Sequence, residues 1–161
     1  MRKALAAAAS AIFVVIAPGF VAGVVPWWIS HWRFDSPLPL RVLGSLMTAI
    51  GVLLLLHCVL RFVLQGIGTP APIFPTRHLV ITGMYRRVRN PMYLAVIATI
   101  LGQALLFGNR ELLEYGAAVW LLFHLFVLIY EEPTLRSTFG AEYEEFCATV
   151  PRWIPHVKNR M

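Results

Sequence analysis

Charged residues are scarce in this chain. They make up 14% of its 161 residues, whereas 58% of the residues are hydrophobic, and the mean hydropathy is +0.69. An ordinary soluble domain contains about 25% charged and about 45–50% apolar residues. The shortage of charge, together with the grouping of apolar residues into long runs, excludes an ordinary soluble domain and favours an integral membrane protein.

Motifs of soluble nucleotide-binding and metal-dependent enzymes are also missing. The sequence contains no G-x-G-x-x-G, no P-loop and no histidine–cysteine spacing that would bind a metal. Its two cysteines lie in different surroundings, Cys58 in an apolar run and Cys147 in a polar tail, so we expect neither a disulfide nor a metal site. Any cofactor must therefore be held by another device.

Four apolar segments are long enough to be considered as membrane spans, at about residues 4–29, 42–60, 92–107 and 112–130. The first follows Arg2-Lys3 as a signal peptide would, but its uncharged run is about twice the usual length, which favours an uncleaved span. Beyond the fourth span, Phe139, Tyr143, Phe146 and Val150 recur at helical intervals on one face. We predict an all-α integral membrane bundle of about four transmembrane helices plus a C-terminal amphipathic helix, in a single domain over residues 1–161.

The distribution of basic residues predicts the orientation of these spans. With the N-terminus in the cytoplasm, four spans place the loop of residues 65–90 and the tail of residues 131–161 on the cytoplasmic side as well. That side then carries Arg2, Lys3, Arg61, Arg77, Arg86, Arg87, Arg89, Arg136, Arg152, Lys158 and Arg160. Only Arg33, Arg41 and Arg110 remain outside, which agrees with the positive-inside rule. The positive net charge is therefore a topology signal suited to membrane lipids, and nucleic acid is not an expected partner.

Two polar segments meet on the predicted cytoplasmic side. The loop is extended in its proline-rich first half, and a turn at Gly83 leads to a short helix before Asn90-Pro91 starts the third span. The tail forms the other polar segment. Any chemistry in water is expected where this loop and this tail converge.

Glu131-Glu132 is the most unusual pair in the chain. One interpretation is a boundary marker, but negative charge at a helix C-terminus opposes the helix dipole, and basic residues are usual on this side. Neighbouring helix residues point about 100° apart, so one glutamate can face the bundle while the other faces loop or solvent. His124 shares a helical stripe with Glu131. A functional role for the pair and a boundary role both stay open at this point.

The segment Arg89-Asn90-Pro91-Met92-Tyr93 also has two interpretations. A basic membrane flank, an N-terminal cap and an interfacial tyrosine would account for every residue. His57 is expected to have a packing role, and Trp27, Trp28 and Trp32 form an interfacial belt.

Taken together, five short motifs resemble one family. They are Gly83-Met84-Tyr85, Arg89-Asn90-Pro91-Met92-Tyr93, Glu131-Glu132-Pro133-Thr134-Leu135, Phe139-Gly140-Ala141-Glu142-Tyr143 and Val150-Pro151-Arg152. In this order and spacing they resemble the isoprenylcysteine carboxyl methyltransferase family, which includes bacterial and archaeal membrane methyltransferases and is related to phospholipid methyltransferases. The resemblance covers about residues 66–155.

The resemblance implies S-adenosylmethionine as methyl donor, with S-adenosylhomocysteine as product. Carried over by motif, the cofactor-binding residues are Arg77, His78, Leu79, Val80, Tyr85, Asn90, Pro91, Met92, Tyr93 and Glu131. A carboxylate such as Glu131 suits a donor that carries a sulfonium and an ammonium group. His124 and Glu132 are the candidates for a catalytic base, which a thiol or amine acceptor would need and a carboxylate acceptor would not.

Two departures from the family pattern concern the acceptor. Asn90 replaces the motif histidine, and Val127 stands where eukaryotic members carry an arginine associated with substrate. The expected acceptor is a lipophilic small molecule or lipidated substrate: an isoprenylcysteine carboxylate, another lipid or a thiol. An NADPH-dependent membrane reductase of the sterol-reductase type and a non-catalytic membrane scaffold are the alternatives.

Overall fold

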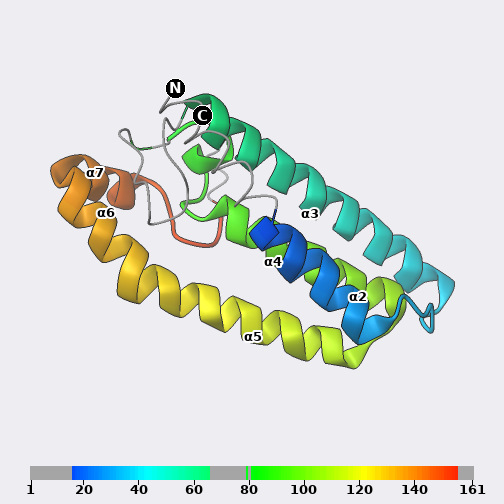
Figure 1. The fold of residues 1–161 in the computed structure, drawn as a ribbon. Helices are drawn as coiled ribbons and strands as arrows, with labels where there is room; N and C mark the ends of the chain where they lie inside the picture. The colour runs from blue at the N-terminus through cyan, green and yellow to red at the C-terminus, as the bar shows by residue number, and fades with distance from the viewer. Residues whose placement is uncertain (1–15, 66–78, 80, 156–161) are drawn as a thin grey trace, which may run out of the picture.

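The computed structural model describes residues 16–65, 79 and 81–155, and the side chains of all of these except 62–65. Within these ranges the chain is helical and contains no strand, as predicted (Figure 1). The larger helices are α2 (Val25–Ser30), α3 (Leu38–Gln65), α4 (Pro91–Phe107), α5 (Arg110–Phe126), α6 (Glu132–Phe139) and α7 (Ala141–Thr149). Three shorter turns join them: the π-helical segments Phe20–Val24 and Val127–Glu131 and the 3₁₀ turn Gly83–Arg86.

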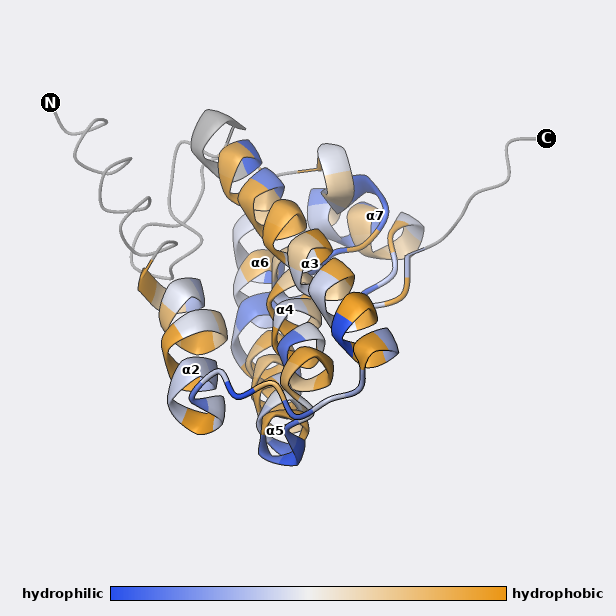
Figure 2. Ribbon diagram, turned by 90° about the vertical axis from the view of Figure 1, so that its right-hand side faces the viewer, coloured by the Kyte–Doolittle hydropathy of each residue, from blue (hydrophilic) through white to orange (hydrophobic). Residues whose placement is uncertain are grey.

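Two helical stretches are long and apolar enough to cross a membrane, Leu38–Arg61 and Arg110–Phe139. Two further apolar helices are shorter, Ile16–Ser30 and Pro91–Phe107. Apolar residues predominate along α3 and α4 in Figure 2, whereas the start of α5 and the region of α7 are more polar. The second and fourth predicted spans thus have the required length. The first and third remain predictions, and the start of the first lies outside the described residues.

The α3–α4 pair is packed most closely, and small residues make this possible. A Cβ atom on Gly102 would lie 2.6 Å from the backbone nitrogen of Thr48, and one on Gly51 would lie 2.5 Å from Thr99 Oγ1. A Cβ atom on Gly44 would collide with the backbone of Leu106. The two backbones therefore approach each other directly, as in small-residue contacts between membrane helices. We call this contact the small-residue interface.

At the end of the bundle away from the polar tail, side chains donate hydrogen bonds to backbone carbonyls of neighbouring segments. Ser36 Oγ donates to Leu106 O at 2.6 Å, next to the left-handed Gly108 that ends α4. Gln103 Nε2 donates to Ala22 O at 2.6 Å and Tyr115 donates to Val21 O at 2.9 Å. The last two bonds satisfy carbonyls of the π-helical segment Phe20–Val24, where the regular helical hydrogen bonding is altered.

The helix of the fourth predicted span does not end at the glutamate pair, so the expected helix end there was wrong. α5, the π turn Val127–Glu131 and α6 form one continuous helix that ends at Gly140, whose φ is 52°. A proline inside a regular α-helix removes a hydrogen bond and crowds the carbonyl one turn earlier. Here the Glu132 amide donates to Val127 O across the wider π turn, which lets the helix continue past Pro133. Glu131 and Glu132 are therefore inside a helix and not at its end.

The described part of the predicted loop and the C-terminal tail meet at one end of the bundle, as the sequence predicted (Figure 1). The Arg89 amide donates to Pro151 O at 2.9 Å. α7 lies between Gly140 and residue 150, so the amphipathic tail forms a short helix followed by an irregular segment. Tyr143 and Val150 from its apolar face are buried. The tail thus caps this end of the bundle.

Candidate functional site

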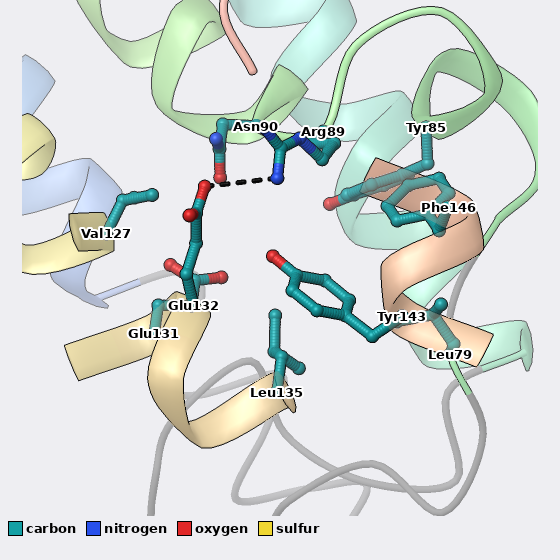
Figure 3. A pocket seen from close by; sticks show the side chains of 10 residues that line it. All are labelled: Leu79, Tyr85, Arg89, Asn90, Val127, Glu131, Glu132, Leu135, Tyr143 and Phe146. Carbon is teal, nitrogen blue, oxygen red and sulfur yellow. Dashed lines mark ion pairs between the residues drawn. The ribbon is translucent and has the colours of Figure 1, made fainter. Parts of the chain in front are cut away.

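A cavity of about 70 Å³ lies where this loop, the π turn, α6 and α7 converge. Ten residues line it, and Figure 3 shows them from close by: Leu79, Tyr85, Arg89, Asn90, Val127, Glu131, Glu132, Leu135, Tyr143 and Phe146. Five of them were predicted as site residues from the sequence. They come from segments more than 40 residues apart, brought together by the convergence described above.

Glu132 is buried and surrounded by cations. Its side chain is 4% exposed, and its two oxygens accept from Arg152 Nε at 2.6 Å and from Arg152 Nη2 at 2.9 Å. Arg89 Nη1 lies 3.1 Å from Oε1, and the more exposed Arg136 lies 3.9 Å from Oε2. Two-point binding of a carboxylate by a guanidinium is a strong and directional contact. These arginines favour the ionised carboxylate and hold it in one orientation.

Glu131 has a different environment, although it is the adjacent residue. Its Oε2 accepts from the Tyr93 hydroxyl at 2.8 Å, and no guanidinium within the described ranges pairs with it. The side chain is half-buried and lines the cavity. Glu131 therefore presents a carboxylate that is oriented by Tyr93 but not neutralised, a group that suits a cationic ligand.

Aromatic side chains form the other walls of the cavity. Figure 3 shows the hydroxyl groups of Tyr85 and Tyr143 pointing toward its interior. Burial raises the pKa of both phenols above the ordinary value, so both are neutral at physiological pH. The hydrogen bond to Glu132 likewise raises the pKa of Arg152, which stays charged. The cavity combines aromatic surface, neutral hydroxyl groups and one carboxylate that has no cationic partner among the described residues.

Asn90 precedes α4 and lines the cavity, but its side chain does not cap the helix. Its Nδ2 donates instead to Arg152 O at 3.2 Å. Pro91 occupies the first turn of α4, as predicted. Pro91 and Met92 do not line the cavity; Met92 packs against the buried pair of Cys58 and Tyr85. Tyr93 acts on the cavity through Glu131.

His124 does not reach the cavity. Its Nδ1 accepts from the indole Nε1 of Trp153 at 3.1 Å, and its ring stacks on Trp120 with a centroid separation of 5.2 Å. The predicted stripe assumed regular helix up to Glu131, whereas the π turn Val127–Glu131 changes the direction of the residues that follow. Three predicted cofactor-binding residues, Arg77, His78 and Val80, lie outside the described residues.

Sequence reasoning missed several residues of the site. Arg89, Arg152, Tyr143 and Phe146 were not among the predicted site residues. A signal was present for three of them, because Arg89, Arg152 and Tyr143 belong to the family motifs, whereas Phe146 was predicted only as part of an apolar helix face. The pairing of Arg89 and Arg152 with Glu132 could not be read from spacing, since 43 and 20 residues separate them from it in the sequence.

The structure is an apolar helical bundle with a small polar cavity at one end, an arrangement typical of a membrane protein. Comparison with known proteins indicates the family. The family described as phospholipid methyltransferase matches residues 40–142. Protein-S-isoprenylcysteine O-methyltransferase of Schizosaccharomyces pombe is 36% identical over 80 residues, which are 48% of this chain and 34% of that protein. The aligned part is thus about a third of that relative. No solved structure gives a significant match.

This chain belongs to the phospholipid methyltransferase family. The resemblance to isoprenylcysteine methyltransferases that the motifs indicated is confirmed. Both comparisons support a membrane methyltransferase, and the two helices of sufficient length agree with it.

Proposed function

We propose that the protein transfers a methyl group from S-adenosylmethionine to a lipophilic acceptor in the membrane. The choice of methyl donor rests on the contrast between Glu131 and Glu132. Three arginines surround Glu132, whereas Glu131 lines the cavity with no cationic partner in the described part of the chain. When bound, S-adenosylmethionine supplies a methyl group on a cationic sulfur, next to an ammonium group. Glu131 would pair with one of these cations in a site partly shielded from water.

The residues present fit part of this donor. A cavity of about 70 Å³ is smaller than the roughly 300–1,000 Å³ of pockets that enclose whole ligands. The proposal therefore assigns to the cavity the cationic part of the donor, near Glu131, Tyr85 and Asn90. The rest of the donor would contact residues 77–80, which the family resemblance predicts to bind the cofactor. The contribution of the protein is mainly orientation of the reactants.

The positive charge of Arg89 favours an acidic methyl acceptor. Arg89 lines the cavity, and its buried Nε has no hydrogen-bond partner within the described ranges. A carboxylate could use this donor and would need no catalytic base, as in an isoprenylcysteine carboxylate. Another lipid or a thiol remains within the proposal. Glu132, already bound by arginines, is better suited to orient the site than to take a proton.

The orientation in the membrane also belongs to the proposal. The N-terminus, the loop of residues 65–90 and the C-terminus would be cytoplasmic, since the basic residues concentrate there. The water-soluble donor would then enter from the cytoplasm, and the lipophilic acceptor from the bilayer. Membrane lipids surround the exposed leucines of α3, such as Leu46, Leu53 and Leu56.

Calorimetric titration of the detergent-purified protein tests the donor. S-adenosylmethionine and S-adenosylhomocysteine should bind and NADPH should not. Glu131→Gln should weaken binding about tenfold to a hundredfold, as expected for loss of a hydrogen bond to a charged group. If Glu131 faces the sulfonium, S-adenosylmethionine loses more affinity than the neutral-sulfur product; equal losses would place the ammonium there.

Glu142→Gln is the matched control, because Glu142 is an exposed glutamate on α7. It should bind both ligands as the unmodified protein does. Absence of binding by both ligands to folded protein would refute the proposed donor. Binding of NADPH alone would favour the reductase alternative.

A further inference from the structure

His124 does not touch the cavity, and two tryptophan side chains hold its ring in place. Trp120 stacks on its ring with an interplanar angle of 10°, and Trp153 donates to its Nδ1. An indole N–H can only donate, so Nδ1 must be the unprotonated acceptor. In the neutral ring the proton is then on Nε2. The lone pair that a general base would need is occupied by Trp153.

Trp153 belongs to the irregular segment that follows α7, and this segment contacts both walls of the cavity. Arg152 holds Glu132 through two bonds, and its carbonyl accepts from Asn90 Nδ2. Pro151 O accepts from the Arg89 amide. Residues 150–153, which we call the tail segment, therefore connect the loop side of the cavity to the helix side.

The end of this segment is attached to α5 by the bond between Trp153 and His124, two turns before the glutamate pair. The contact is aromatic on three sides, since Trp120, His124 and Trp153 have mutual centroid distances of 5.2–6.5 Å. Such contacts favour one placement of the rings. Arg152 is the residue immediately before Trp153, so anchoring of the indole limits where its guanidinium can lie.

We propose that His124 is a positioning residue and not a catalytic base: its Nδ1 anchors Trp153, and through it the tail segment whose Arg152 holds Glu132 beside Glu131. The inference rests on the proposed function for the ligand bound in the cavity. Loss of the anchor lowers the fraction of molecules with the tail segment in place. The apparent affinity for the ligand falls with that fraction.

Three variants test this assignment. His124→Asn keeps an acceptor near the position of Nδ1 but cannot titrate, His124→Leu removes the acceptor, and Trp153→Phe removes the donor while keeping a ring. Arg110→Gln serves as control, because its exposed pair with Glu114 lies at the other end of α5. Two readouts are needed: hydrogen exchange of the backbone amides of Val150, Arg152, Trp153 and Ile154, and the dissociation constant of S-adenosylhomocysteine. Thermal unfolding verifies that each variant is folded.

We expect His124→Leu and Trp153→Phe each to accelerate tail exchange and to weaken binding about tenfold, the usual effect of one lost buried hydrogen bond. The double variant should be no worse than either single variant, because both remove the same bond. His124→Asn and Arg110→Gln should stay within about twofold of the unmodified protein.

The assignment is overturned if His124→Leu leaves both readouts unchanged, or if His124→Asn loses as much affinity as His124→Leu. Faster tail exchange with unchanged affinity would also overturn it, since the tail segment would then not affect the site. Failure of the unmodified protein to bind S-adenosylhomocysteine would count against the proposed function alone. The exchange data would still report the anchoring of the tail.

Discussion

The small-residue interface between α3 and α4 and the polar end of the bundle are stabilised in opposite ways. At the interface Gly44, Gly51 and Gly102 allow backbones to touch, and the contact depends on shape alone. At the polar end a few charged and aromatic side chains connect segments that share little helix-to-helix packing. The comparison teaches that the small-residue interface leaves no room for an added side chain, whereas the polar end is held by paired charges.

The largest effect is expected at Glu132. Glu132→Gln removes the buried carboxylate that pairs with Arg89 and with the partly exposed Arg152, which should lower the free energy of unfolding by up to about 3–5 kcal/mol. Denaturant unfolding in detergent measures this. Glu142→Gln, exposed on α7, is the control. An equal effect of the two substitutions would show that the polar end does not depend on the buried ion pairs.

A smaller loss is expected when the small-residue interface is filled. Gly102→Ala places a methyl group against the Thr48 backbone and should destabilise the protein by about 1–3 kcal/mol, as overpacking does. Gly19→Ala is the matched control, a helical glycine with no atom within 4 Å of the added methyl group. It should be neutral or slightly stabilising, because alanine favours helix. Comparable thermal stability of both variants would contradict the close backbone contact.

Glu131→Gln should not lower the free energy of unfolding, in contrast to Glu132→Gln. The half-buried Glu131 carboxylate has no cationic partner within the described ranges, so neutralising it relieves a cost of burial. We expect unchanged stability or a gain of up to about 1 kcal/mol, measured by the same unfolding experiment. Loss of stability equal to that of Glu132→Gln would mean that the adjacent glutamates have equivalent roles.

Arg136→Gln should produce the smallest change among these substitutions. Arg136 lies 3.9 Å from Glu132 and its side chain is 47% exposed, so solvent screens the pair. Arg152→Gln removes the two short bonds to the same carboxylate and should lower the melting temperature clearly more. If the two arginine variants have the same melting temperature, the two-point contact is not what holds Glu132.

Much of the fold was predictable from the sequence, because long uninterrupted runs of apolar residues indicate membrane helices. The second and fourth spans were predictable in this way, and the start of α4 was predictable from Pro91. The end of the fourth span was not. Glu131, Glu132 and Pro133 together resemble a helix end, but the π turn that carries the helix through them depends on local backbone geometry with no sequence signature of its own.

The site was partly predictable from its motifs. Tyr85, Asn90, Glu131 and Glu132 come from the family motifs and line one cavity together with Leu79, which precedes the turn at Gly83; their roles stay predictions. Arg77, His78 and Val80 lie outside the described residues and stay predictions. The catalytic role of His124 or Glu132 also stays a prediction, and the geometry favours a positioning role for both.

By itself the sequence determined that this protein is helical and apolar, that its polar segments lie at one end, and that two adjacent glutamates stand at that end within family motifs. These properties depend on composition and on the order of residues along the chain. Only the tertiary structure decided which glutamate is neutralised. Adjacent residues differ by one helical step, and their charge state depends on neighbours in space: among the described residues, Arg89 and Arg152 reach Glu132, whereas Glu131 contacts Tyr93 and the cavity.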